Sequence, residues 1–437
     1  MSKFTYIELF AGIGGFGTAL NRLGGECVFA SEIDKFASKA YETLYGGVML
    51  HGDITKIDEK EIPNHDILTA GTPCQSFSVA GKRKGFDDTR GTLFFDVARV
   101  AKEKQPKVVW IENVKGLVNH DKGRTLDVMI ETLNEIGYTV DFDVLNSKYF
   151  GVPQNRERIF IVAIRDDLIG QEEWSEEATK GQTVVPRGKR RLMKYGWLKS
   201  FNFDFPAQEE VSTRLRDILE SEVDEKYYLD EEKTAKLVEQ LEEKYSPIPG
   251  EINVRTNVSP SQHSTGNVYD VRGICPTVKT MQGGMDKLKI TEPQMLGHVD
   301  IRGNDSIKRT YSTEGISPTL TSMGGGHREP KIAEPQEIAN IDDLSYCIDA
   351  NYSKGISPSS IGKGRRTHIE EQLPKYRIRK LTPLECWRLQ GFPDDAHEAV
   401  KQAGISDSQR YKQAGNAVTV NVVESIGERL IPIITEI

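Results

Sequence analysis

The chain reads Thr5-Tyr-Ile-Glu-Leu-Phe-Ala-Gly-Ile-Gly-Gly-Phe-Gly17 near its start, an apolar run followed at once by closely spaced glycines. The apolar run predicts a buried strand, and the amphipathic residues up to Leu23 predict a helix. Glycines at such a junction let the backbone approach a ligand at the positively polarised N-terminus of a helix. The stretch therefore predicts an α/β fold with a cofactor-binding loop.

The same alternation of short apolar runs and amphipathic stretches continues to residue 165, as expected for a parallel sheet covered by helices. We therefore predict a doubly wound, mostly parallel sheet that binds its ligands outside the carboxyl ends of its strands. The predicted strands are Thr5–Phe10, Cys27–Ala30, Asp66–Ala70, Lys107–Ile111, Val140–Leu145 and Arg158–Ile164, and the predicted helices are Gly15–Leu23, Lys35–Leu44, Leu93–Lys102 and Thr125–Ile136.

Two acidic residues lie at the predicted ends of the strands that follow the glycine loop. Glu32 is placed to accept hydrogen bonds from ribose hydroxyls, and Asp53, in Gly52-Asp-Ile, is placed to hold an adenine amino group. Either acid could instead cap a helix. Because the loop also satisfies the G-x-G-x-x-G pattern of NAD-binding folds, these residues alone allow any cofactor that carries adenosine.

A cysteine loop and a strand-end acid are predicted at the same edge of the sheet. Cys74 lies in Gly71-Thr-Pro-Cys-Gln-Ser-Phe-Ser78, and Glu112 follows the strand Lys107–Ile111. A thiol becomes nucleophilic when a cation or a helix N-terminus lowers its pKa. A single cysteine in a proline-containing loop is more often inert, however, and a strand-end acid often caps a loop.

Two arginines precede the last of these strands, in Gln154-Asn-Arg-Glu-Arg158. In an extended strand Gln154, Arg156 and Arg158 would lie on one face. Two guanidinium groups directed at one place suit a phosphate or a carboxylate. Surface salt bridges are the alternative.

The alternation ends after residue 165, and a charged segment with Gly, Pro and Ser follows. We predict a smaller inserted domain at residues 166–378 and a return to the first domain at 379–437, with a helix Val418–Leu430 stopped by Pro432. The inserted segment repeats itself near 273–294 and 315–336: Gly273-Ile-Cys-Pro-Thr-Val and Gly315-Ile-Ser-Pro-Thr-Leu are 42 positions apart. Strand-turn units are favoured for these repeats over independent binding modules.

The net charge of -8 argues against a polyanionic partner, but the distribution of charge matters more than the sum. Residues 180–199 contain basic side chains and no acid, and this stretch could contact nucleic acid phosphates or form a solvated face. Its candidate contacts are Arg187, Lys189, Arg190 and Arg191.

The five cysteines are scattered and form no C-x-x-C pair, so neither a disulfide framework nor a metal site is expected. The sequence contains no run of eighteen apolar residues and no signal peptide pattern. We therefore expect a cytoplasmic protein that does not enter a membrane.

Nine segments, in this order along the chain, resemble the DNA (cytosine-5) methyltransferases of bacteria and their phages. The resemblance covers residues 1–165 and 376–437, and the middle matches nothing so well, as expected for the variable target-recognition domain of that family. The segments are Phe10-Ala-Gly-Ile-Gly-Gly, Glu32, Gly52-Asp-Ile, Pro73-Cys-Gln-Ser-Phe-Ser, Arg90-Gly-Thr-Leu-Phe, Glu112-Asn-Val, Gln154-Asn-Arg-Glu-Arg, Arg379-Lys-Leu-Thr-Pro-Leu-Glu-Cys-Trp-Arg-Leu-Gln-Gly-Phe-Pro and Gln413-Ala-Gly-Asn-Ala-Val.

The resemblance implies the fold of S-adenosylmethionine-dependent methyltransferases and methyl transfer from that cofactor to carbon 5 of a cytosine flipped out of double-stranded DNA. It makes Cys74 the nucleophile at carbon 6 and Glu112 the donor to N3. It places Arg158 near the base and Arg156 near a phosphate, and it assigns Ser78 and Gln154 to DNA contacts. The cofactor residues that it implies are Phe10, Gly12, Gly14, Glu32, Ile33, Asp53, Ile54, Pro73, Leu93, Asn416 and Val418.

The resemblance further implies a monomer that belongs to a restriction-modification system, with a separate endonuclease, or that acts as a phage or orphan methylase. An RNA cytosine methyltransferase of the same fold and a catalytically silent DNA-binding protein are the rivals. The long middle domain favours DNA over RNA, and Cys74 and Glu112 together argue against a silent protein. Departures from the family pattern lie at Ser76, Ala80 and Ile33.

Overall fold

The computed structural model describes residues 2–72, 93–209, 211–213, 215–228 and 376–435, together with six short strands between residues 254 and 335. Cys74, Pro73 and Ser78 lie outside the described residues. Within the described part of the chain, no helix has the length and apolar character needed to cross a membrane.

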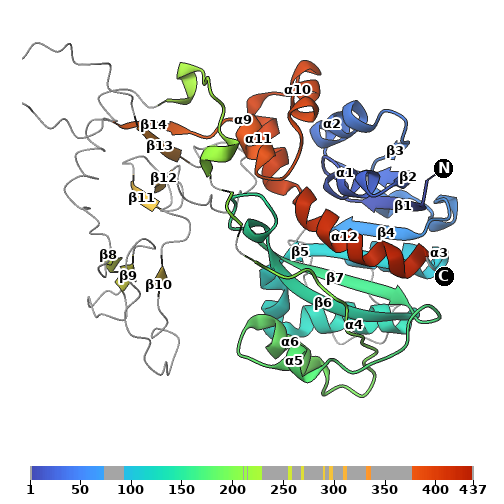
Figure 1. Cartoon of the computed structure of the whole chain (residues 1–437). Coiled ribbons are helices and arrows are strands. Elements are labelled where there is room, and N and C mark those ends of the chain that lie inside the picture. The colour runs from blue at the N-terminus through green and yellow to red at the C-terminus, as the bar shows by residue number, and fades with distance from the viewer. Residues whose placement is uncertain are drawn as a thin grey trace, which may run out of the picture.

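The large body is built on a seven-stranded sheet in the order β3-β2-β1-β4-β5-β7-β6 (Figure 1). The first five strands in this order are parallel, whereas β7 runs antiparallel to both of its neighbours. The predicted fold class, a mostly parallel α/β sheet, is confirmed. The strands are β1 Phe4–Leu9, β2 Gly25–Ser31, β3 Leu50–His51, β4 Ile67–Gly71, β5 Val108–Val114, β6 Tyr138–Asn146 and β7 Glu157–Arg165.

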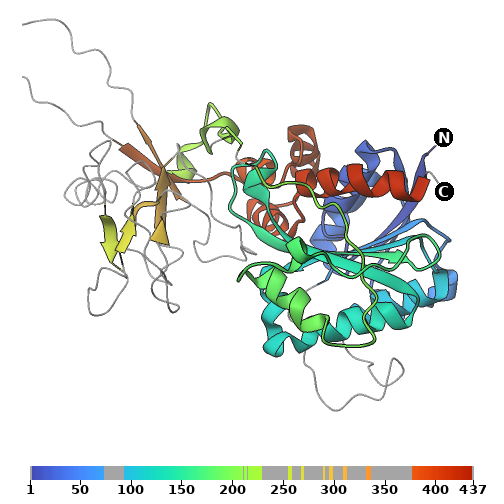
Figure 2. The same cartoon turned by 60° about the horizontal axis from the view of Figure 1, so that its bottom comes forward.

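Helices cover both faces of this sheet because successive side chains of a buried strand point to opposite faces. On β5, Trp110 packs edge-on against Phe16 of α1, with ring centroids 5.2 Å apart, while Val109 and Ile111 belong to the core on the other face. Helices α1 and α12 lie on the first face, and α3 and α4 lie on the second (Figures 1 and 2). The helices are α1 Gly15–Arg22, α2 Lys35–Tyr45, α3 Leu93–Lys104, α4 Arg124–Glu135 and α12 Val420–Thr435.

Helix α12 continues through Pro432, so the prediction that this proline stops the helix was wrong. A proline removes one backbone donor, which leaves a carbonyl one turn earlier without its helical partner. Pro432 lies on the exposed side of the helix, where water can satisfy that carbonyl. Ile431 and Ile434 meanwhile hold the last turn in the core.

The core of the large body extends beyond residue 165, where the sequence predicted a domain boundary. Trp174, Val185 and Leu192 belong to the core on the α3 and α4 side, and Phe201 and Phe203 belong to the opposite one. These described residues beyond 165 therefore pack against the first domain. The helices that follow β7 are α5 Glu176–Thr179, α6 Val184–Leu192, α9 Pro383–Arg388, α10 Asp394–Gln402 and α11 Asp407–Asn416.

Short 3-10 turns connect several of these elements, and the turn after β3 takes part in the site described below. They are η1 Ile54–Lys56, η2 Glu59–Glu61, η5 Lys115–Gly123, η6 Ser147–Tyr149, η7 Leu215–Ile218 and η8 Glu225–Tyr227.

Two smaller sheets lie beside the large body in both views (Figures 1 and 2). One contains three strands in the order β10-β9-β8, and the other contains four in the order β11-β12-β13-β14. Strand β14 leads directly into α9 of the large body. The strands are β8 Val254–Asn257, β9 Asn267–Tyr269, β10 Lys289–Ile290, β11 Met295–His298, β12 Arg309–Ser312, β13 Lys331–Pro335 and β14 Tyr376–Lys380.

The sequence repeat is also a repeat of structure. Strand β9 pairs antiparallel with β8 and parallel with β10, and β12 pairs in the same two senses with β11 and β13. The parallel register is Lys289 opposite Val268 in the first copy and Lys331 opposite Thr310 in the second, which is a displacement of 42 positions at both partners. Residues 254–290 and 295–335 thus contain two copies of one three-stranded unit. The Gly273 and Gly315 motifs themselves lie outside the described residues.

Candidate active site

A pocket of about 650 Å³ opens at the carboxyl ends of β1, β2, β4 and β5. This is the edge at which a parallel sheet is expected to bind its ligand. The catalytic candidates Glu112, Arg156 and Arg158 line the same pocket as most of the predicted cofactor residues. The cofactor candidates that line it are Phe10, Gly12, Glu32, Ile33, Asp53, Ile54, Leu93 and Asn416.

Two predicted cofactor residues support the pocket without lining it. Gly14 is the N-cap of α1 with a positive φ of 79°, and a β-carbon there would lie 2.4 Å from the ring of Tyr45. The packing of that ring therefore requires glycine at position 14, and the assignment of Gly14 as a cofactor contact stays a prediction. Val418 packs its backbone against Gly15, where a β-carbon would lie 2.5 Å from the Val418 carbonyl oxygen.

The third glycine of the G-x-G-x-x-G pattern also has a structural explanation. A β-carbon on Gly17 would lie 2.8 Å from a carboxyl oxygen of Glu8, which is 1% exposed. This carboxyl accepts hydrogen bonds from the backbone N–H groups of Phe16 and Gly17 and from the hydroxyl of Tyr41. Since the Gly14 N-cap has no side chain to offer, Glu8 satisfies the first turn of α1 from the strand beneath it. Glu8 was not among the predicted residues, although an acid inside an apolar strand is a signal.

Burial raises the pKa of Glu8 to about 8, against hydrogen bonds that favour the charged form. The folded protein therefore keeps a proton that the unfolded chain has already lost above its ordinary pKa of about 4.3. The contribution of this proton to the free energy of unfolding is complete below a pH of about 4.3 and is lost as the pH rises toward 8. We expect Glu8→Gln, which stays neutral, to flatten the fall in melting temperature between pH 5 and pH 8.

The control for this prediction is Glu26→Gln, which makes the same substitution at an exposed position on the neighbouring strand. The measurement is thermal unfolding at half-unit pH steps for the wild type and both variants. Parallel pH profiles for the wild type and Glu8→Gln would contradict the assignment of the proton to Glu8.

The carboxylate of Glu32 is fixed in the pocket wall. One of its oxygens accepts from the backbone N–H of Gly12 at 2.8 Å, and the other accepts from that of Asp34 at 2.7 Å. The N-cap of α2 is Asp34, so the alternative of a helix cap does not apply to Glu32. Each oxygen of Glu32 keeps a lone pair for a further donor in the pocket.

Asp53 caps η1 by accepting from the backbone N–H of Thr55 at 3.1 Å, and it also lines the pocket. The capping role that was its alternative is thus present. Apolar walls are supplied by Phe10, Ile54 and Leu93, and Ile33 is 73% exposed at the pocket. Apolar surfaces for a ring, together with fixed carboxylates for hydroxyl and amino donors, fit an adenosine-bearing cofactor in a pocket of ordinary ligand size.

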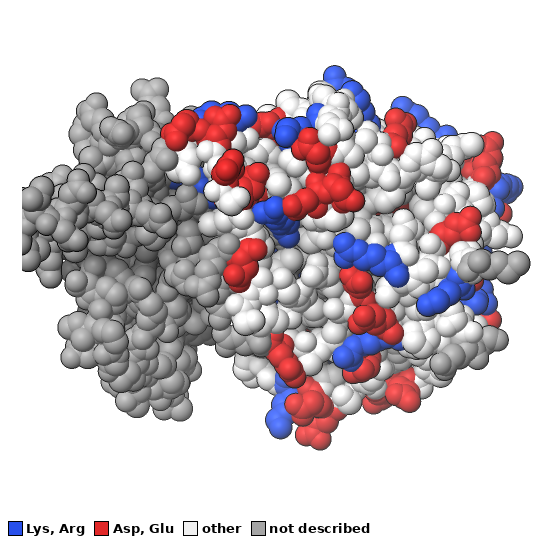
Figure 3. All heavy atoms as spheres, turned by 45° about the horizontal axis from the view of Figure 1, so that its top comes forward, with Lys and Arg blue, Asp and Glu red and all other residues white. Residues whose placement is uncertain are grey.

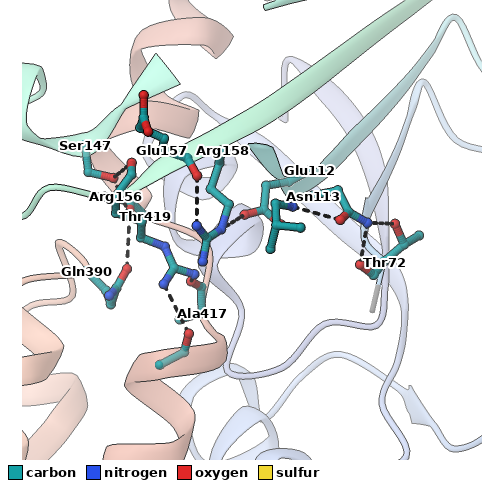
Figure 4. A network of polar contacts seen from close by, with 12 residues as sticks. Thr72, Glu112, Asn113, Ser147, Arg156, Glu157, Arg158, Gln390, Ala417 and Thr419 are labelled. Carbon is teal, nitrogen blue, oxygen red and sulfur yellow. Dashed lines mark hydrogen bonds and ion pairs between the residues drawn. The ribbon is translucent and has the colours of Figure 1, made fainter. Parts of the chain in front are cut away.

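Glu112 lies at the end of β5 beside Arg158 of β7 (Figure 4). The Arg158 Nε atom is 3.1 Å from a carboxyl oxygen of Glu112, which is 7% exposed. Burial raises the pKa of Glu112, although Arg158 and Arg156 act in the opposite direction. Burial therefore favours the protonated form of this carboxyl relative to an exposed one.

The predicted common face is formed only in part: Arg156 and Arg158 line the same pocket, whereas Gln154 is directed to the carbonyl of Leu389. Arg156 is 2% exposed and donates to the carbonyls of Gly415 at 3.2 Å and Ala417 at 2.7 Å (Figure 4). Arg156 therefore holds the segment that contains Asn416. Burial lowers the pKa of the Arg156 guanidinium to about 9.

Gln154 was predicted to contact DNA, but it is 0% exposed and donates to the carbonyl of Leu389 at 2.8 Å. Its amide oxygen also accepts from Gln390 at 3.3 Å. A side chain in this position joins two parts of the large body, so the prediction of a direct DNA contact is corrected.

Asn113 was quoted in a motif but not predicted as a site residue. Its Nδ2 donates to the carbonyl of Thr72 at 2.8 Å and to the hydroxyl of the same residue at 2.9 Å (Figure 4). Thr72 is the last described residue before the segment that contains Cys74. Asn113 therefore ties the end of β4 to the end of β5, next to Glu112.

The basic stretch predicted to contact DNA is largely engaged within the fold. Lys189 is 4% exposed, forms an ion pair with Asp141 at 2.7 Å, and is excluded as a phosphate contact. Arg190 donates to the carbonyls of Thr179 and Gly181, and Arg191 pairs with Asp127 at 2.8 Å. Among the candidates, Arg187 is exposed.

Charge is mixed on one face of the large body. In the face shown in Figure 3, acidic and basic side chains alternate over the large body and do not gather into a patch of one sign. This face therefore offers no continuous basic surface for a polyanion.

Comparison with known proteins identifies relatives along the whole chain. Residues 4–432 match the family model described as C-5 cytosine-specific DNA methylase. The orphan methyltransferase M.Rho11sI of Bacillus phage rho11s is 46% identical over 99% of this chain and 98% of its own length. The orphan methyltransferase M.SPRI of Bacillus phage SPR is 42% identical with the same coverage, and the type II methyltransferase M.HhaI of Haemophilus parahaemolyticus is 34% identical over 98% of this chain and 94% of its own length.

Solved structures with the same fold are more distant in sequence. The Dnmt2 methyltransferase of S. pombe aligns with a TM-score of 0.54 at 18% identity, covering 98% of both chains. A DNMT2 mutant from Spodoptera frugiperda aligns with a TM-score of 0.56 at 18% identity, covering 98% of this chain and 99% of its own. At this identity the likeness concerns the fold, and it agrees with the predicted class.

Proposed function

The chain belongs to the C-5 cytosine-specific DNA methylase family, and from this membership we propose how its pocket methylates carbon 5 of cytosine in DNA. The activity of the protein is that of a DNA (cytosine-5-)-methyltransferase. The observation that carries the proposal is that Glu112 and Arg158 line the same pocket as Phe10 and Glu32. A base held by the first two residues and a cofactor held by the last two would share one pocket.

S-adenosylmethionine is the methyl donor of this family and, when bound, supplies an electrophilic methyl group on a sulfonium. The fixed carboxylate of Glu32 would accept from the ribose hydroxyls, and Asp53 would accept from the adenine amino group. Phe10, Ile54 and Leu93 would cover the apolar faces of the nucleoside. Family membership removes NAD as the alternative for the glycine loop.

Cys74 is proposed as the nucleophile. Carbon 5 of cytosine is a poor nucleophile. Addition of a thiolate to carbon 6 raises the electron density at carbon 5. A proton or hydrogen bond from Glu112 to N3 would stabilise the charge that the addition places on the ring. Carbon 5 would then take the methyl group, whose bond to the sulfonium breaks to leave a thioether. Loss of the proton on carbon 5 to water and release of Cys74 would restore the aromatic ring.

The burial of Glu112 supports extrusion of the target base. At 7% exposure its carboxyl is beyond the reach of a base that stays stacked in a duplex. Enzymes that act on such an atom flip the nucleotide into a pocket at a cost of about a few kcal/mol. Arg158, beside Glu112, would contact the flipped base, whereas Arg156 acts through the backbone of the segment that contains Asn416.

Target recognition is assigned to the two three-stranded units. They share one pairing scheme, they lie beside the large body, and the chain between its two catalytic parts contains both. Because the two copies differ in the residues between their strands, they suit the recognition of two different DNA sequences. The Bacillus phage relatives are named orphan methyltransferases, and we extend that status, without a partner endonuclease, to this chain.

Bisulfite sequencing of treated DNA tests both the chemistry and the recognition. Protected cytosines should fall in two distinct sequence contexts, because each unit reads its own. Replacing residues 273–278 with alternating glycine and serine should remove one context and keep the other, and the same change at 315–320 should do the reverse. Loss of both contexts in each variant, with the fold intact by circular dichroism, would contradict separate recognition. Full bisulfite sensitivity after wild-type treatment would contradict methylation at carbon 5.

A further inference from the structure

We propose that Arg99 is a positioning residue that fixes the adenosine side of the cofactor pocket, so that this arginine sets cofactor affinity without touching the cofactor. The role assigned to Arg99 rests on the proposed binding of S-adenosylmethionine in this pocket. Arg99 lies on α3 and is not among the residues that line the pocket.

All three guanidinium nitrogens of Arg99 are engaged. Nη2 donates to the carbonyl of Ile54 at 2.5 Å, and Nη1 donates to the carbonyl of Ile57 at 3.0 Å and to Glu59 at 2.6 Å. Nε donates to Asp96, one turn earlier on α3, at 2.9 Å. One side chain thus joins α3 to the whole turn η1 and to the start of η2.

The two elements that Arg99 joins supply two walls of the pocket. Turn η1 begins at Ile54 and is capped by Asp53, and both residues line the pocket. Helix α3 begins at Leu93, which also lines the pocket. Ile54 packs in one buried core with α3, and Arg99 adds directed polar contacts between the same two elements.

The geometry suits arginine better than lysine. The carbonyl of Ile54 already accepts from the backbone N–H of Ile57 at 3.1 Å within η1, so Arg99 is its second donor. The planar fork of arginine reaches two carbonyls and a carboxylate at once, whereas an ammonium is a single point of charge. With 22% of its side chain exposed, Arg99 makes these bonds largely shielded from water. Without the fork, Ile54 and Asp53 would lose their fixed position relative to Leu93.

The experiment compares the wild type with Arg99→Gln and Arg99→Lys. Affinities for S-adenosylmethionine and for adenosine are measured by titration calorimetry and by competition, and kcat is measured at saturating cofactor. We expect Arg99→Gln to weaken the binding of both ligands by the same factor of about ten. This is the size of effect seen when a group that orients a ligand contact is lost. Arg99→Lys should show the same defect in part. We expect kcat at saturation to stay within about twofold.

The matched control is Lys104→Ala, on the same helix, whose ammonium donates to the carbonyl of Lys60 in η2 at 2.9 Å, away from the pocket. This variant should bind both ligands as the wild type does. The role of Arg99 would be overturned if both Arg99 variants kept the affinity of the wild type. It would also be overturned if they bound S-adenosylmethionine more weakly but adenosine as tightly as the wild type. If Arg99→Gln does not fold, Arg99→Lys decides by the same criterion. Failure of the wild type itself to bind S-adenosylmethionine would overturn the proposed cofactor site.

Discussion

Replacing Cys74 with serine should abolish methylation of DNA while leaving the cofactor pocket intact. A hydroxyl is a far weaker nucleophile than a thiolate, and removal of a covalent nucleophile lowers turnover by roughly 10⁴-fold or more. The assay is transfer of labelled methyl groups to DNA, with affinity for S-adenosylmethionine measured in parallel. Affinity should stay within about twofold, because the residues assigned to the cofactor are unchanged.

Cys27→Ser is the matched control for this substitution. Burial raises the pKa of the Cys27 thiol to about 11, so this cysteine is not a thiolate near neutral pH. The variant should methylate as the wild type does. DNA that carries 5-fluorocytosine at the target adds a second measurement, since its carbon 5 has no proton to lose and the covalent complex should persist. Wild-type turnover by Cys74→Ser, or a persistent complex with it, would disprove the covalent mechanism.

The fold was predictable because its signals are local and periodic. The apolar strands and the glycine junction at Phe10 each depend on a few neighbouring residues, and these predictions were confirmed. The end of α12 was not predictable in the same way. Whether Pro432 stops a helix depends on which side of the helix it occupies, and only the packing of Ile431 and Ile434 decides that side.

In the candidate site, the positions of the acidic residues could be predicted from sequence, but the partners of the charged side chains could not. Sequence order was enough to bring Glu32 and Glu112 to one edge of the sheet, because parallel strands end together. The partners of charged side chains were not readable. Lys189 pairs with Asp141 and Arg99 with the turn after β3, contacts between residues some forty or more positions apart. A basic stretch therefore gave a false signal for DNA contacts, and an important arginine gave no signal.

Glu112→Gln should lower kcat by roughly 10²–10⁴-fold, the usual range for a general acid, with little change in cofactor affinity. Glutamine keeps the shape of the side chain and can still offer N–H to N3, but it cannot transfer a proton. The wild type should also lose activity as pH rises through the pKa of Glu112, which burial raises above its ordinary range. The protonated form is the active donor, so the loss lies on the alkaline side, and the glutamine variant should lack this limb.

Glu157→Gln separates this role from a simple change of charge at the pocket. Glu157 precedes Arg158 directly, but its side chain is 44% exposed and pairs with Lys115 at 2.7 Å. Its replacement removes the same charge one residue from the same arginine, and kcat should stay within about threefold. If both variants lost the same activity, the effect of Glu112 would be one of local charge and not of proton donation. If Glu112→Gln lost cofactor affinity as steeply as kcat, the carboxyl would be holding the pocket together and would have no separate role toward the base.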